Sequence, residues 1–167
     1  MIVTYQGGNS FKISQGELSV VLNPQAKTSA DVTIFALAKD SLSNVSEKSG
    51  FVIAGPGEYE IKDIFIKGFP GANYLVILEG IRVCYLSNPN PTEEFDDVDI
   101  LLTSPAHYKS AVALEPSIII PMGHDKASLA QFLREAGAKD VESLDKLVVK
   151  KKDLEGKKGE VVVLKEE

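Results

Sequence analysis

Histidine is the side chain best suited to bind a metal or move a proton at neutral pH, and this chain has two, His107 and His124. Asp125 follows His124, so these two side chains could form half of a mononuclear metal site, or a base with its orienting carboxylate. Asp125 is also placed to cap the helix expected after it, and His107 can be a polar surface imidazole near a helix N-terminus. We favour capping for Asp125 and the surface role for His107. His124 is the first functional candidate.

Three other motifs have both a chemical and a structural interpretation. Glu58 and Glu60 alternate along an expected strand, where a carboxylate pair could serve as acid and base, although two solvated glutamates explain the spacing better. Gly55-Pro56-Gly57 could hold an anion with backbone N–H groups, but proline donates none, so a tight turn is favoured. Cys84 lies in the apolar run Ile81–Leu86, which indicates a buried, inert thiol.

Short strands dominate the first two-thirds of the chain, since apolar, β-prone runs alternate there with Gly, Pro and Asn. Hairpins are expected at Gln15-Gly16-Glu17 and at Glu79-Gly80. The polar stretch Lys39–Gly50 has no clear period and is expected to be a loop. The predicted strands are Ile2–Tyr5, Phe11–Ile13, Leu18–Leu22, Asp31–Phe35, Phe51–Ala54, Tyr59–Ile61, Ile64–Ile66, Tyr74–Leu78 and Ile81–Leu86.

Residues 98–136 follow a different pattern, a β-α-β-α unit. The strand Val98–Leu102 precedes a helix that starts at Ser104-Pro105 and ends by Glu115, before Pro116. The second strand, Ile118–Ile120, is apolar throughout, and the two strands should be parallel with a right-handed crossover. The second helix is expected from Asp125 to Ala136, capped by Gly137. Its buried face has helical spacing: Leu129, Phe132, Leu133 and Ala136.

The C-terminal segment, residues 145–167, is rich in lysine and includes the cluster Lys150-Lys151-Lys152. Such a cluster can bind nucleic acid. The runs Leu147–Val149 and Val161–Leu164 on either side of it favour instead a closing hairpin with a solvated lysine face.

Composition limits the class of protein. The chain has 167 residues, 44% hydrophobic and 25% charged, which fits one compact globular domain over residues 1–167. A formal net charge of −6 argues against nucleic acid as a partner. No signal peptide or membrane-spanning run is visible, and one cysteine allows no internal disulfide, so we expect a cytoplasmic protein.

Several segments, in order, resemble the metallo-β-lactamase superfamily, especially its small Zn-dependent hydrolases. The most specific is Ala54–Ile61, AGPGEYEI, which is similar to a "gPGEYEi" stretch of one subgroup. The resemblance covers roughly residues 1–136. It implies an αββα sandwich, in which two mixed β-sheets lie face to face with outer helices and the site at one edge. The other matching segments are Ile2–Tyr5, Gly8–Ile13, Leu22-Asn23-Pro24, Asp31–Phe35 and Ile118–Met122.

The family's metal ligands are largely replaced in this chain. Asn9 stands at the first supporting histidine, and the H-x-H-x-D-H loop corresponds to Ala36–Asn44, which contains no histidine. The third motif corresponds to Lys67–Gly71, also without histidine, and the bridging aspartate falls on Ser87-Asn88. Only His124, within Pro121–Asp125, matches the final histidine, with one residue inserted. The two histidines of the chain are fewer than the three in the signature loop alone, so no dinuclear zinc site of the family type is expected.

The sequence therefore supports three hypotheses from different classes. The preferred one is a non-catalytic binding or assembly module without a cofactor, in which Asn9, Asn88, His107 and His124 mark the binding edge. The second is a hydrolase of esters, lactones or phosphodiesters with one Zn²⁺, held by His124 with Asp40, Asp125 or His107. The third is an anion or nucleotide binder at the same edge. The ligand is an unidentified small molecule or protein, no membrane is expected, and self-association is compatible with the sequence.

Overall fold

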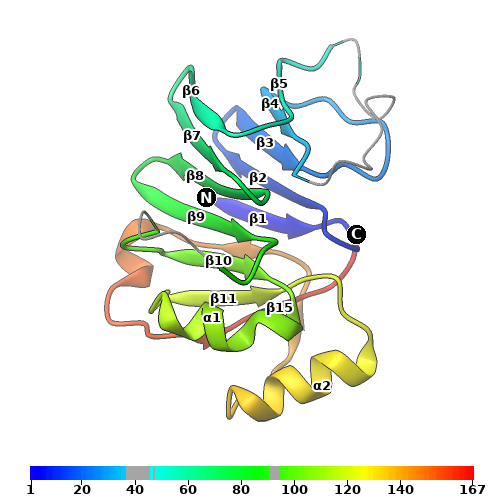
Figure 1. Cartoon of the computed structure of the whole chain (residues 1–167), viewed down its shortest axis with the longest axis vertical. Coiled ribbons are helices and arrows are strands. Elements are labelled where there is room, and N and C mark those ends of the chain that lie inside the picture. The colour runs from blue at the N-terminus through cyan, green and yellow to red at the C-terminus, as the bar shows by residue number, and fades with distance from the viewer. Residues whose placement is uncertain (37–45, 47, 91–94) are drawn as a thin grey trace.

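Two β-sheets lie face to face and form most of the molecule (Figure 1). The structure is a computed structural model that describes residues 1–36, 46, 48–90 and 95–167. Both sheets are mixed, because each contains parallel and antiparallel strand pairs. This confirms the fold class expected from the sequence.

The first sheet has six strands and is built mainly from the N-terminal part of the chain. Its central hairpin turns at Gly16, as predicted, and pairs Phe11 with Leu22. In spatial order the strands are β13 (Leu147–Val148), β1 (Ile2–Tyr5), β2 (Phe11–Gln15), β3 (Leu18–Leu22), β4 (Val32–Ile34) and β5 (Phe51–Ile53).

The second sheet has seven strands. The predicted hairpin at Glu79-Gly80 joins β8 to β9, and the predicted parallel pair of the β-α-β-α unit is present, with Ile100 opposite Ile118. In spatial order the strands are β14 (Glu160–Val161), β11 (Ile118–Pro121), β10 (Ile100–Thr103), β9 (Ile81–Leu86), β8 (Asn73–Leu78), β7 (Ile64–Phe69) and β6 (Gly57–Ile61).

Two α-helices cover the outer face of the seven-stranded sheet (Figure 1). The first helical segment starts after Ser104, as predicted, with a 3₁₀ turn, η2 (Pro105–His107), that continues into α1 (Tyr108–Ala113). Ser104 makes no side-chain capping bond there, because Pro105 and the 3₁₀ geometry define the start. The second helix, α2 (Lys126–Glu135), follows Asp125 at the N-cap and ends before Gly137, which has a φ of +64°.

The hydrophobic core lies between the sheets and, separately, beneath the helices. One cluster joins alternate residues of both sheets, including Ile13 of β2 and Val76 of β8. The other joins the opposite face of the seven-stranded sheet to Ala111 of α1 and Phe132 of α2. The strands β10 and β11 are buried on both faces because they contribute to both clusters.

The predicted C-terminal hairpin is wrong. Leu147–Val148 pairs antiparallel with β1, whereas Glu160–Val161 pairs in parallel with β11, so the two segments lie in different sheets. Strand β15 (Val163–Leu164) pairs instead with β12 (Ser143–Leu144). A 3₁₀ turn, η3 (Lys151–Leu154), follows β13 in the sequence and precedes β14. Strands β13 and β14 each extend the edge of one large sheet, which buries more apolar surface than an isolated hairpin would.

Several smaller expectations are confirmed, and some strand boundaries are corrected. Glu58 and Glu60 are exposed, and Glu58 pairs with Lys67 at 2.9 Å. Cys84 is fully buried, and burial raises the pKa of its thiol. Strand β7 continues to Phe69, three residues beyond the predicted end at Ile66. No described helix is long and apolar enough to cross a membrane.

Candidate functional site

One edge of the sandwich gathers the ends of several strands. The parallel strands β9, β10 and β11 end side by side there, and the turn between β1 and β2 meets them. A pocket of about 310 Å³ opens between these strand ends. Its lining residues are Asn9, Tyr85, Ser87, Ser104, His107, Met122 and Gly123.

The turn after β1 is tied to the loop after β11. Gly123 N donates to Gly8 O at 2.7 Å and lies 3.3 Å from Tyr5 Oη, which itself donates to Gly8 O at 2.9 Å. Gly123 has a φ of +60°, and a Cβ there would lie 2.8 Å from Oδ1 of Asn9. Glycine at this position adopts the left-handed conformation without strain and leaves room for the Asn9 side chain.

His124 lies beside this pocket, although it is not among the residues that line it. Its ring stacks on Tyr5, with ring centroids 6.0 Å apart and an angle of 26° between the planes. Burial lowers the pKa of His124, and the charge of Asp125 opposes this only in part, so the imidazole is neutral at pH 7. Nε2 is buried and has no hydrogen-bond partner among the described residues.

Asp125 caps α2, as favoured from the sequence. Its Oδ1 accepts from Ser128 N at 2.7 Å, while Asp125 N donates to Oγ of Ser128 at 3.0 Å, which completes a capping box. The backbone N of Ser128 and its Oγ, which also donates to Oδ1 at 2.8 Å, lower the pKa of the Asp125 carboxyl group. The carboxylate is thus engaged by the helix, and its alternative role in orienting His124 stays a prediction.

His107 lines the pocket from the 3₁₀ turn after β10. Its backbone N donates to Ser104 O at 2.9 Å, and its ring Nδ1 is buried without a hydrogen-bond partner in the described part of the chain. The side chain is half-buried, so His107 is more enclosed than the surface imidazole that we expected. The structure therefore brings His107 and Asn9 to one pocket.

Asn88 lies next to the pocket but is not among its lining residues. Its Oδ1 accepts from Asn90 N at 3.0 Å, within its own loop. Asn73 holds this loop in place, because its Oδ1 accepts from the backbone N of Ser87 and of Asn88, both at 2.9 Å. The role of Asn73 was not predicted from the sequence. The signal that could have indicated it is an asparagine at the start of a buried strand.

Asn23 has the same role on the other sheet. Its Nδ2 donates to Tyr85 Oη at 2.9 Å and to Asn9 O at 3.2 Å, and its Oδ1 accepts from Ala36 N at 2.8 Å. Asn23 is buried and has a φ of +47°, a left-handed conformation that asparagine tolerates. Tyr85, inside an apolar run, gave no separate signal in the sequence.

The candidate ligand Asp40 lies outside the described residues. The same is true of residues 37–44 of the segment that corresponds to the H-x-H-x-D-H loop, so only Ala36 of that segment is described, and it is buried.

No family model and no curated protein matches the chain, but solved structures do. One is a protein from Thermotoga maritima provisionally assigned as a Zn-dependent hydrolase of the metallo-β-lactamase superfamily. It superposes with a TM-score of 0.76 at 23% identity and covers 98% of each chain. The chain has the metallo-β-lactamase fold.

Other proteins with this fold are more distant in sequence. A protein of Parabacteroides distasonis, provisionally assigned as a metal-dependent hydrolase, gives a TM-score of 0.65 at 14% identity over 99% of this chain and 93% of that one. The metallo-β-lactamase-fold protein YhfI from Bacillus subtilis gives 0.60 at 9% identity, over 98% and 96%. At these identities the likeness establishes the fold and leaves the activity of this chain open.

The described residues do not fit the two zinc ions that the metallo-β-lactamase fold commonly holds. Zinc needs imidazole, carboxylate or thiolate ligands, and no group of three His, Cys, Asp or Glu gathers anywhere in the described ranges. The pocket is lined by one imidazole with amide, hydroxyl and thioether groups. At the expected ligand positions, Asn9 packs against Gly123, and Ser87 Oγ donates to Ala72 O at 3.1 Å.

Proposed function

We propose that residues 1–167 form a single metallo-β-lactamase-fold domain that has lost the dinuclear zinc centre and acts as a non-catalytic binding module. Its binding edge consists of Asn9, Asn88, His107 and His124. The observation that supports the proposal is the pocket at this edge, whose described lining consists of amide, hydroxyl, thioether and imidazole groups. None of the described residues that line it is a carboxylate or a thiolate.

The pocket suits a small polar ligand. Its lining offers the amide of Asn9, the hydroxyl groups of Ser87 and Ser104, and the imidazole of His107. A buried nitrogen without a partner, as at Nδ1 of His107, costs about 1–3 kcal/mol, which a hydrogen bond to a ligand or a water recovers. Donors and acceptors of this kind fix the orientation of a ligand through hydrogen-bond geometry.

A mononuclear zinc hydrolase is the second candidate, and one observation favours it. His107 and His124 each keep a buried ring nitrogen without a partner among the described residues, and neutral imidazole nitrogen is a zinc ligand. As in the sequence-based hypothesis, His124 would hold the ion together with Asp40, Asp125 or His107. A zinc ion held there would activate a water for hydrolysis.

Metal content separates the two candidates. The protein is purified from zinc-supplemented medium, dialysed and measured by elemental analysis, together with His124→Ala, His107→Ala and, as a control, the exposed Glu58→Ala. We expect less than stoichiometric zinc in all four proteins and no turnover of generic ester, lactone or phosphodiester substrates. About one zinc per chain, lost in His124→Ala and retained in Glu58→Ala, would reject the module without a metal, and turnover of one of these substrates would support the hydrolase.

Ligand binding tests the module itself. Thermal-shift measurements with a panel of polar metabolites, inorganic phosphate and nucleotides should reveal a ligand that stabilises the protein. The shift should disappear in Asn9→Ala and persist in Glu58→Ala. A shift with phosphate or nucleotides would select the anion-binding hypothesis. If no compound raises the melting temperature, the ligand-binding role is rejected. Light scattering that detects only a monomer would then reject an assembly role as well.

A further inference from the structure

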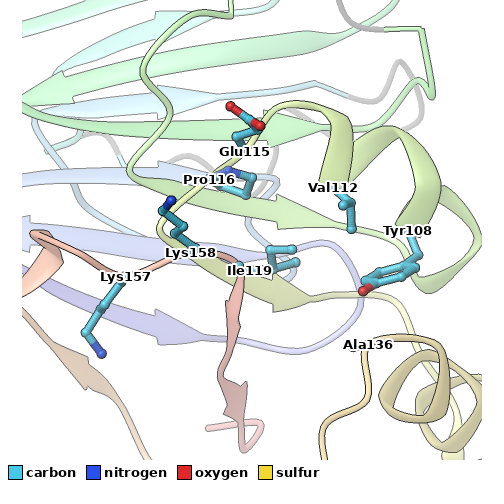
Figure 2. Close-up of a pocket in the computed structure, with 9 residues that line it drawn as sticks. Tyr108, Val112, Glu115, Pro116, Ile119, Ala136, Lys157 and Lys158 are labelled. Carbon is cyan, nitrogen blue, oxygen red and sulfur yellow. The ribbon is translucent and has the colours of Figure 1, made fainter.

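A second, larger pocket lies on the outer side of the seven-stranded sheet (Figure 2). It measures about 460 Å³ and is formed by α1, the segment after it, the start of β11, the end of α2 and the residues before β14. It shares no lining residue with the pocket at the sheet edge. The residues that line it are Tyr108, Val112, Glu115, Pro116, Ile119, Ala136, Lys157, Lys158 and Gly159.

One side of this pocket is apolar. Tyr108 and Val112 of α1 lie across from the lysines, with Ile119 between them (Figure 2). The Tyr108 ring packs edge-on against Phe132, with centroids 5.2 Å apart, which fixes its position. Val112 is 45% exposed, one of the most exposed large hydrophobic residues in the described ranges. An apolar ligand body in the pocket would therefore cover surface that water now contacts.

The walls of the pocket are tied together by the backbone. Gly159 N donates to Pro116 O at 2.7 Å, and Glu160 N donates to Ser117 O at 3.0 Å, next to the parallel pairing of β14 with β11. Gly159 has a φ of +64°, which turns the chain after Lys158 into the sheet. These hydrogen bonds hold the two walls of the pocket in fixed positions, which lowers the entropy loss that binding must overcome.

The opposite side of the pocket carries positive charge. Lys157 forms an ion pair with Glu160, whereas Lys158 is exposed and makes no ion pair with a described residue. Glu115 is the acidic lining residue, and its carboxylate points away from Ile119 (Figure 2). Lys158 thus offers an ammonium group across the pocket from Tyr108 and Val112 (Figure 2). A charged group at one side of a pocket and apolar side chains at the other are complementary to a ligand that has one negative group on an apolar body.

We propose that this pocket binds a small amphipathic anion, an alkyl or aryl carboxylate. Lys158 pairs with its carboxylate, and Tyr108, Val112 and Ile119 contact its apolar body. The volume lies within the range of about 300–1,000 Å³ that is typical of small-molecule sites. The proposal is independent of the proposed function, because the two pockets have no residue in common.

The test is a calorimetric titration of the full chain with decanoate below its micelle concentration. We expect saturable binding, and at least about fivefold weaker binding to Lys158→Glu and to Val112→Asp. Two matched variants control for charge and for exposed apolar surface: Lys152→Glu, an exposed lysine outside the pocket, and Val148→Asp, 63% exposed on β13. Both should bind decanoate like the unaltered protein.

Two further measurements locate the ligand and test its charge. Decanoate should shift the amide NMR signals of Val112 and Gly159, and decyltrimethylammonium, with the same chain and opposite charge, should not bind. The proposal is overturned if decanoate shows no saturable binding, if the control variants weaken it equally, or if the cation binds as well. Binding to anionic vesicles, or dimer formation through this face, without a response to monomeric decanoate would overturn it too.

Discussion

Gly123→Ala should destabilise the protein more than the same change at a glycine of similar backbone conformation elsewhere. Gly123 and Gly137 have φ values of +60° and +64°. A Cβ at Gly123 would lie 2.8 Å from Oδ1 of Asn9, whereas a Cβ at Gly137 meets no atom within 4 Å. Both substitutions force alanine into the left-handed region, at about 1–2 kcal/mol. Only Gly123→Ala must also displace the Asn9 side chain.

The backbone at Gly123 cannot relieve this contact cheaply, because its N–H donates to Gly8 O at 2.7 Å. We therefore expect Gly137→Ala to lower the free energy of unfolding by about 1 kcal/mol and Gly123→Ala by about 2–3 kcal/mol. For a protein of this length, each kcal/mol corresponds to about 2–4 °C in Tm.

The assay is urea unfolding of five proteins: the unaltered chain, Gly123→Ala, Gly137→Ala, Asn9→Ala and the double variant Asn9→Ala/Gly123→Ala. In the double variant, removal of the amide should recover about 1 kcal/mol relative to the sum of the single losses. Equal losses for the two glycine variants, or strictly additive losses in the cycle, would refute the contact between the β1–β2 turn and the β11 loop.

Three further predictions concern burial. Burial lowers the pKa of His124 below 6.5, so as the pH falls the unfolded chain binds a proton before the folded protein does. The free energy of unfolding therefore keeps its full value above about pH 6.5 and declines as the pH falls toward the folded pKa. In urea titrations, His124→Gln should remove this decline. Cys84, 0% exposed with a pKa raised by burial, should react with a thiol reagent only at the rate of unfolding, and rapid reaction of the native protein would contradict its placement. Phe132→Ala, at a side chain 1% exposed, should cost about 3–5 kcal/mol in unfolding free energy, whereas the exposed Gln131→Ala should change it by less than about 0.5 kcal/mol.

Local sequence signals predicted most individual elements of the described chain. Gly16 and Glu79-Gly80 indicated hairpins because their backbone needs left-handed conformations, and both positions have positive φ. Asp125 and Gly137 indicated the ends of α2 because a capping carboxylate and a left-handed glycine satisfy the free backbone groups there. These signals act over a few residues, so they can be detected in the sequence alone.

Pairing of the short C-terminal strands could not be predicted. Leu147–Val148 and Glu160–Val161 are each two residues long, and a pair of this length carries little preference for any partner. Their partners, β1 and β11, lie far away in the sequence. Only the completed sheets offer edges where these residues become buried, and that burial selects the pairing.

The candidate site was predictable from the sequence in part and depended on the tertiary structure in part. Its general position followed from the resemblance, which put His124 and Asn9 at one edge of the sandwich. Hydrogen bonds between distant residues decide its form: Asn23 reaches Tyr85, and Asn73 holds the backbone of Ser87. No local pattern marks such partners, because an asparagine becomes an organising residue only when the fold surrounds it with unsatisfied backbone groups.

The sequence by itself determined the scarcity of imidazole, since two histidines are a property of composition that no folding can change. It also determined the order of strands, turns and helix caps, which depend on neighbouring residues. The tertiary structure decided that His107 enters a pocket with Asn9, and that Lys158 lies across from Tyr108 and Val112. Such neighbours are chosen by the packing of whole sheets and helices, whose energy is shared among many contacts and is not encoded in any one segment.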